Sequence, residues 1–220
     1  MAKRQFKAES KRLLDLMVNS IYTHKEIFLR EIISNASDAC DKLCYQALTD
    51  DAVGMSRKDF KIEIKVDKEH RTLTVSDNGI GMDKEDLENN LGVIASSGSY
   101  KFKQEVGDDA KDTDVIGQFG VGFYSAFMVA DHITVVTRKY GTDAAWMWQS
   151  SGADGYTITE CERDAVGTDI IMHIKPDTDD EKYSEFLESW RLQELVRKYS
   201  DYIRFPIRME VSKTRRKEGS

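Results

Sequence analysis

Proline, cysteine and long apolar runs are all scarce in this sequence. Two prolines and 14 glycines among 220 residues exclude the collagen-like and low-complexity classes. The three cysteines, Cys40, Cys44 and Cys161, make an odd number without a disulfide framework, so free thiols of a cytoplasmic protein are expected. No stretch approaches the roughly 20 apolar residues of a membrane span. The first apolar run is interrupted by Asp15 and does not fit a signal peptide.

The charge balance is moderately acidic. The 32 Lys and Arg residues against 39 Asp and Glu residues give a formal net charge of −7. This balance argues against general nucleic-acid binding and against a basic membrane-binding surface. A hydrophobic fraction of 40% beside 32% charged residues is typical of a globular chain. The length suits one large domain or two small ones, and no internal repeat or linker divides the chain.

The apolar positions predict a mixture of helices and strands. Helical spacing runs through residues 10–48, with a break near 19–24, and alternation at 60–76 predicts a β-hairpin. Asp83 is placed to cap a helix that runs towards Leu91. An apolar helix, four short strands, an amphipathic helix and a last strand are then expected at 123–130, 133–137, 145–149, 156–159, 170–174, 179–202 and 207–211. This order predicts one α+β domain with a mostly antiparallel sheet and helices on one face.

Polar residues recur along one face of the predicted helix at 25–48. Glu31, Asn35, Asp38 and Lys42 follow one another at positions i, i+4, i+7 and i+11. Such a face is commonly just solvated. An amide oxygen one turn away from a carboxylate would also bind a hard cation beside a general base.

Two glycine-containing segments add to this pattern. After a predicted strand, Asp77 would offer a carboxylate to a ligand amino group, while Gly79 and Gly81 would let the backbone approach a flat ring; an ordinary turn has the same sequence. Glycines at 117–122 precede a helix, where N–H groups and the dipole favour phosphates, although a hinge fits as well. No Gly-Lys-Ser/Thr follows, so this is not a Walker A loop. Together the three patterns indicate a nucleoside triphosphate site.

The same residues resemble a known family. The run from Phe28 to Ala39 closely resembles the signature of the ninety-kilodalton heat-shock chaperones, and further motifs of that family follow in order at 77–82, 89–92, 117–127 and 167–168. The resemblance covers about 6–211 and matches the family's N-terminal nucleotide-binding domain. It implies a Bergerat-type two-layer α/β sandwich with a mobile lid, which binds ATP or ADP with Mg²⁺ and hydrolyses ATP.

The resemblance also implies roles for individual residues. Glu31 matches the general base, with Arg30 beside it, and Asn35 matches the Mg²⁺ ligand. Asp77 matches the acceptor for the adenine amino group. The other nucleotide-binding positions that it implies are Asp38, Gly81, Met82, Asn90 and Thr168, and a phosphate-binding lid hinge at Gly117, Gln118, Phe119, Gly120, Val121, Gly122 and Phe123.

The family pattern further implies how the chain is organised. Residues 1–211 would form the nucleotide-binding domain with a lid at about 92–123, and the charged tail at 212–220 would precede an absent middle domain. The resemblance implies a chaperone that dimerises at full length, is monomeric and slow as this fragment, and contacts client proteins mainly elsewhere. Ser96 stands where the family often has a lysine, which would alter ATP binding or lid closure.

Two other functions remain open at this point. One is an ATPase of the same fold from the DNA mismatch-repair or topoisomerase type, and the other is a nucleotide sensor that does not hydrolyse its ligand. Cys40 and Cys44 lie one helical turn apart, and thiols that pack in or near the core are expected there rather than a metal site. The four histidines form no cluster in the sequence, so each is expected to be structural or exposed.

Overall fold

The computed structural model describes residues 2–6, 11–12, 14–15, 24–91 and 122–211. The described part contains one seven-stranded sheet in the order β5-β4-β3-β6-β2-β1-β7. The strands are β1 (Ile62–Asp67), β2 (Thr72–Asp77), β3 (Ala130–Arg138), β4 (Ala145–Ser150), β5 (Tyr156–Cys161), β6 (Gly167–Ile174) and β7 (Ile207–Met209). All neighbouring pairs are antiparallel except β1 and β7, which run parallel. The prediction of a mostly antiparallel sheet is confirmed.

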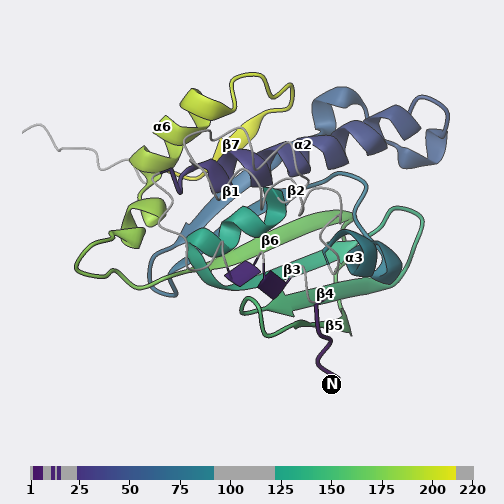
Figure 1. Ribbon diagram of the computed structural model, residues 1–220. Helices are drawn as coiled ribbons and strands as arrows, with labels where there is room; N and C mark the ends of the chain where they lie inside the picture. Colours follow the sequence, from purple (N-terminus) through teal and green to yellow (C-terminus); the bar gives the residue numbers. More distant parts are fainter. Residues whose placement is uncertain (1, 7–10, 13, 16–23, 92–121, 212–220) are drawn as a thin grey trace, which may run out of the picture.

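The helices gather on one side of this sheet (Figure 1). They comprise α2 (Ile27–Gln46), α3 (Lys84–Asn90) and α6 (Ser189–Tyr199), with short 3-10 helices η1 (Asp51–Val53), η2 (Arg57–Asp59), η3 (Gly122–Met128) and η4 (Tyr183–Leu187). Asp83 caps α3 as predicted: its side chain accepts from the Asp86 N–H, and the Asp86 side chain accepts from the Asp83 N–H. The two-layer α+β architecture is therefore the expected one.

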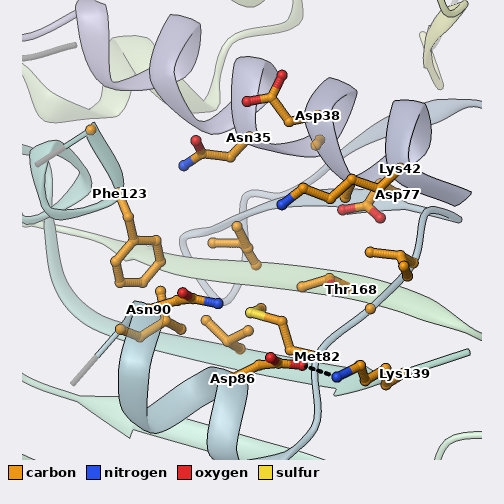
Figure 2. A pocket seen from close by; sticks show the side chains of 18 of the residues that line it. Asn35, Asp38, Lys42, Asp77, Met82, Asp86, Asn90, Phe123, Lys139 and Thr168 are labelled. Atoms are coloured by element: carbon orange, nitrogen blue, oxygen red, sulfur yellow. Dashed lines mark ion pairs between the residues drawn. The ribbon is translucent and has the colours of Figure 1, made fainter. Parts of the chain in front are cut away.

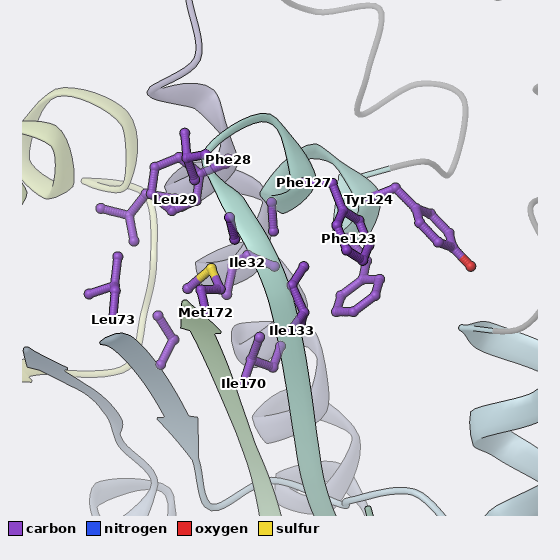
Figure 3. Packing of buried hydrophobic residues seen from close by; sticks show 14 of the residues in the cluster. Phe28, Leu29, Ile32, Leu73, Phe123, Tyr124, Phe127, Ile133, Ile170 and Met172 are labelled. Carbon is purple, nitrogen blue, oxygen red and sulfur yellow. The ribbon is translucent and has the colours of Figure 1, made fainter. Parts of the chain in front are cut away.

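The core lies between α2 and the sheet (Figure 3). Phe28, Leu29 and Ile32 of α2 are fully buried because they recur on the helix face that meets the strands. Alternate residues of the strands, including Leu73, Ile133 and Met172, supply the opposing surface. Phe123, Tyr124 and Phe127 of η3 extend this core towards β4 and β5 through aromatic contacts. A continuous apolar layer thus fixes α2 relative to β2, β3 and β6.

Two predicted helices differ from the structure. The segment at 123–130 forms the 3-10 helix η3, and β3 already begins at Ala130. The single helix predicted at 179–202 is divided into η4 and α6, because Glu188 between them adopts an extended conformation. This break resets the helical phase. Leu192 and Leu195 face the core, whereas Trp190, predicted as an apolar position of that helix, is 65% exposed on the other side.

Several predicted features cannot be compared with the structure. Most of the proposed lid at 92–123 and the whole charged tail at 212–220 lie outside the described residues. The departure at Ser96 lies outside them too. Within the described residues, no helix has the length and apolar character needed to cross a membrane. The three cysteines are free thiols, and Cys40 is buried.

Candidate functional site

A cavity of about 500 Å³ opens between α2, α3, the start of η3 and the sheet. Figure 2 shows polar side chains of α2 along one side of it and Met82 and Asn90 on the other. Its lining residues are Glu31, Asn35, Ala36, Asp38, Ala39, Lys42, Asp77, Ile80, Gly81, Met82, Asp86, Asn90, Leu91, Gly122, Phe123, Val135, Lys139, Thr168 and Ile170. Apart from Arg30, every predicted site residue within the described part of the chain lines this cavity.

The polar face of α2 forms one wall of the cavity. Glu31 is buried, whereas Asn35, Asp38 and Lys42 are exposed at its open side. Partial burial raises the pKa of the Asp38 carboxyl, against the opposing effect of the Lys42 charge. The face is therefore neither fully solvated nor packed in the core. Its oxygen and nitrogen atoms border a space that a ligand can enter.

Glu31 is held by Arg30 through one carboxylate oxygen, and its other oxygen lies close to the backbone of Gly122. Its Oε1 accepts from the Arg30 Nε at 2.9 Å and pairs with the Arg30 Nη2 at 2.8 Å. Its Oε2 lies 2.6 Å from where a Cβ on Gly122 would stand, so only glycine fits there without movement of the carboxylate. Arg30 thus orients a buried carboxylate at the end of the cavity near η3, and Gly122 leaves the space that this carboxylate occupies.

Asp77 lies at the end of β2 and is only 8% exposed. Burial raises its pKa to about 7, although the Gly79 N–H, which donates to Oδ1 at 2.9 Å, and the charge of Arg163 act to lower it. The register of the sheet places Asp77 opposite Thr168 of β6. A carboxylate and a hydroxyl therefore meet at the floor of the cavity.

Hydrogen bonds of the Thr137 hydroxyl connect the segments around this floor. Thr137 donates to the Gly167 carbonyl at 3.1 Å and accepts from the Met82 N–H at 2.9 Å. The hydroxyls of Thr137 and Thr168 lie 2.9 Å apart, and either of them can donate in this contact. When Thr168 donates to Thr137, its hydroxyl oxygen can accept from a ligand or a water. Asp77 and Thr168 thus both present oxygen atoms at this floor of the cavity.

The loop from Asp77 to Met82 is fixed by close backbone approaches. A Cβ on Gly79 would lie 2.3 Å from the carbonyl carbon of Ala39, and the Ile80 N–H donates to the Ala39 oxygen at 3.0 Å. Gly81 has a φ of +69°, and a Cβ there would meet the Arg138 oxygen at 2.0 Å. The backbone at the two glycines does approach other atoms closely, as predicted. The atoms that it approaches belong to α2 and to the end of β3, not to a ligand. The glycines position the loop against the protein.

Sequence reasoning missed one charged group at the cavity mouth. Lys139, just after β3, pairs with Asp83 at 2.7 Å and with Asp86 at 2.8 Å, and the second pair is drawn in Figure 2. These two carboxylates raise the pKa of the Lys139 ammonium. Lys139 and Asp86 line the cavity from elements that lie far apart in the sequence, so no local pattern indicated their meeting. The pairing ties the N-terminus of α3 to the sheet.

Comparison with known proteins identifies the family of this chain. Residues 22–168 match the family model described as histidine kinase-, DNA gyrase B-, and HSP90-like ATPase. The chain belongs to this ATPase family. It is also 59% identical over 221 residues to the chaperone protein HtpG of Clostridium perfringens strain 13, of Bacillus subtilis strain 168 and of Clostridium acetobutylicum. Each match covers 100% of this chain but 35% of the relative, so the chain spans about a third of the length of the curated relatives it matches.

The HSP90-like family assignment gives the cavity a chemical context. A Mg²⁺ ion that travels with a nucleotide takes oxygen ligands, mostly phosphates and waters, and needs only one or two from the protein. Asn35 points into the cavity one helical turn from Glu31, and its amide oxygen suits that role (Figure 2). Among the described residues, no group of three or more acidic, histidine or cysteine side chains forms an all-protein metal cage. The donor set therefore fits a nucleotide-borne ion.

The predicted lid hinge is only partly placed by the structure. Gly122 and Phe123 line the cavity next to Glu31 and Leu91. Gly117, Gln118, Phe119, Gly120 and Val121 lie outside the described residues, so their phosphate-binding role stays a prediction. The structure thus describes the cavity on its α2, β2, β6 and α3 sides.

Proposed function

We propose that this chain is the ATP-binding and ATP-hydrolysing domain of a molecular chaperone that assists protein folding. The observation that carries the proposal is the placement of two buried carboxylates, Glu31 and Asp77, in one cavity. Asp77 lies beside the loop that contacts Ala39, and Glu31 lies eight residues earlier on α2, which is about 12 Å along the helix axis. One elongated ligand can therefore contact both, with a ring at Asp77 and its terminal phosphate near Glu31.

Asp77 and Thr168 act at the base end of this ligand. The Asp77 carboxylate accepts from the exocyclic amino group of a ring such as adenine, and the Thr168 hydroxyl oxygen lies opposite Asp77 for a second polar contact. Met82, half-buried beside them, supplies an apolar surface for the ring. Burial strengthens each of these hydrogen bonds, because water competes less for the same atoms.

Glu31 acts at the phosphate end. It takes a proton from the attacking water, and Arg30 holds its carboxylate in place through the 2.8 Å and 2.9 Å contacts. Asn35 would hold Mg²⁺ through its amide oxygen, and that ion supplies neutralisation of the phosphate charge when bound. Asn90 and the start of η3 border the same end and contact ribose and phosphates. Hydrolysis by this domain alone is slow.

The relatives support the chaperone over the other members of this ATPase family. Similarity at 59% identity extends over the whole chain and not only over the nucleotide motifs. By this proposal ATP closes the lid and drives association of two N-terminal domains within a cytoplasmic homodimer, while clients bind mainly outside this domain. The acidic net charge of −7 agrees with a domain that does not bind DNA. Stimulation of hydrolysis by duplex DNA would instead support the mismatch-repair or topoisomerase type.

Calorimetric titration tests the base end of the site. The 220-residue chain is titrated with Mg-ADP and with a non-hydrolysable ATP analogue, beside Asp77→Asn. We expect the wild type to bind both nucleotides and the variant to lose binding, because an amide nitrogen would face the donor of the ring. Unchanged binding by the variant would remove Asp77 from the centre of the site.

Single-turnover hydrolysis tests the phosphate end. Glu31→Ala should retain nucleotide affinity and lose about 10²–10⁴-fold in rate, the usual contribution of a positioned base. Glu63→Gln on β1, whose carboxylate pairs with Lys61 and lies outside the cavity, is the matched control and should hydrolyse at the wild-type rate. Equal rates for wild type and Glu31→Ala would make the domain a nucleotide sensor.

A further inference from the structure

The face of the sheet opposite the helices brings two histidines together. His132 of β3 and His173 of β6 are direct partners in the antiparallel register. Their neighbours Ile133 and Met172 are fully buried beneath α2, so both imidazoles project from the other face. Directly opposed residues have Cβ atoms about 4.5–5.5 Å apart, within reach of a shared ligand.

Each imidazole is oriented through the same ring nitrogen. The Nδ1 of His173 lies 2.6 Å from the Asp131 Oδ1, and the Nδ1 of His132 lies 2.9 Å from the Ser151 Oγ. No partner is described for either Nε2 within the part of the chain that the structure covers. A carboxylate or hydroxyl on one nitrogen fixes the ring and makes the other nitrogen a better metal ligand. This is the arrangement by which proteins prepare histidines for metal binding.

A local irregularity in β3 produces the arrangement. The register shifts between Ala130 and His132, so Asp131 is an additional residue in the strand. Such a bulge lets two residues of one strand oppose a single residue of its partner. Asp131 therefore reaches His173 although His132 already stands opposite to it. A regular strand would have turned Asp131 towards the helices.

We propose that His132 and His173 bind one divalent transition-metal ion, with Asp131 and Ser151 as positioning residues. Imidazole nitrogens suit Zn²⁺, Cu²⁺ and Ni²⁺, whereas Mg²⁺ prefers oxygen, so this site is separate from the nucleotide cavity. Two protein ligands leave coordination positions for water or for a group of a second molecule. The described residues offer no third His, Cys, Asp or Glu ligand there, so the site is open and exchangeable.

The chain contains a matched control for this proposal. His70 has the same kind of carboxylate partner, with its Nδ1 2.8 Å from the Asp67 Oδ2. It lies in the turn between β1 and β2, and the register pairs no histidine with it among the described residues. If a single oriented imidazole were enough to bind the metal ion, His70 would bind it as tightly as the pair does. If two imidazoles are required, substitution of His132 or His173 weakens metal binding and substitution of His70 does not.

Calorimetric titration with Zn²⁺ and with Cu²⁺ tests the site. The chain carries no histidine tag, and the buffer does not chelate metals. The pH is about 7.5, where imidazole is mostly neutral. Cys44→Ser and Cys161→Ser in the background remove thiol competition. We expect one ion per chain. His132→Ala and His173→Ala should each weaken binding by at least about tenfold, and Asp131→Asn by about tenfold.

The controls separate this site from general surface binding and from the nucleotide site. His70→Ala should leave metal affinity unchanged, and His132→Ala should leave Mg-ADP affinity unchanged. Both positions of the pair should tolerate alanine, which a thermal melt of each variant verifies. The proposal is overturned if no binding occurs, if neither pair variant weakens it, or if His70→Ala weakens it equally.

Discussion

Replacement of Asp77 by asparagine should have opposite effects on ligand binding and on the stability of the free domain. Asp77 is only 8% exposed, and its burial raises the pKa of the carboxyl to about 7 from an ordinary value of 3.8. Between these two values the folded chain keeps a proton on Asp77 that the unfolded chain has lost. Because the folded state binds more protons, its stability falls as the pH rises through this interval.

The size of this effect follows from the pKa difference. One pKa unit corresponds to about 1.4 kcal/mol, so ionisation of Asp77 removes about 3 kcal/mol of stability between about pH 5 and pH 7. Above about pH 8, where Asp77 is ionised in both states, the penalty stays constant. The asparagine of the variant has no such penalty, and its amide oxygen can still accept from the Gly79 N–H, which now donates to Asp77 at 2.9 Å.

Thermal unfolding of wild type and Asp77→Asn at pH 5 and pH 8 measures this difference. The melting temperature of the variant relative to wild type should be higher at pH 8 than at pH 5 by roughly 6–12 °C, given about 2–4 °C per kcal/mol for a chain of this size. The comparison between variant and wild type cancels the titration of all other groups. Calorimetry on the same samples should show nucleotide binding only by the wild type.

A pH-independent difference between the two chains would refute the reasoning. It would mean that Asp77 is ionised in the folded state at pH 5 as well as at pH 8. Loss of both binding and stability at every pH would show a general structural role instead. The combination of lost affinity with gained stability at pH 8 is specific to a buried carboxylate that is kept for its ligand.

Three further predictions concern the backbone, the metal ion and the thiols. Gly81→Ala should destabilise the domain more than Gly141→Ala in chemical denaturation. A side chain at either positive φ costs about 1–2 kcal/mol, but only the Cβ added at Gly81 would also meet backbone, at 2.0 Å. Equal losses of stability in the two variants would contradict this clash. Asn35→Ala should weaken Mg-ADP binding but leave ADP binding in EDTA unchanged, as measured by calorimetry; equal weakening would argue against a metal ligand. Burial raises the pKa of Cys40 to about 12, so this thiol should resist alkylation at pH 8 while the half-buried Cys161 reacts. Mass spectrometry of the folded chain measures which cysteine is modified first, and modification of Cys40 first would contradict its burial.

Local patterns in the sequence determined most elements and the polar face of α2, whereas the family resemblance supplied most of the other predicted site residues. The hairpin at 60–76, the cap at Asp83 and the polar face of α2 depend on residues within one or two turns of each other, so periodicity and capping rules were sufficient. The predicted division into helix and strand was wrong where packing decided. An extended Glu188 separates η4 from α6, and η3 is a 3-10 helix that leads directly into β3.

Only the tertiary structure decided which distant residues meet. The pairing of Lys139 with Asp86, the opposition of Asp77 and Thr168, and the contact of Gly122 with Glu31 all join segments that lie far apart in the sequence. The histidines show this most clearly, since they form no cluster in the sequence. The register of β3 against β6 and the bulge at Asp131 bring two of them to one spot. Sequence patterns specify local geometry and the buried face, whereas strand order and register exist only once the whole sheet has formed.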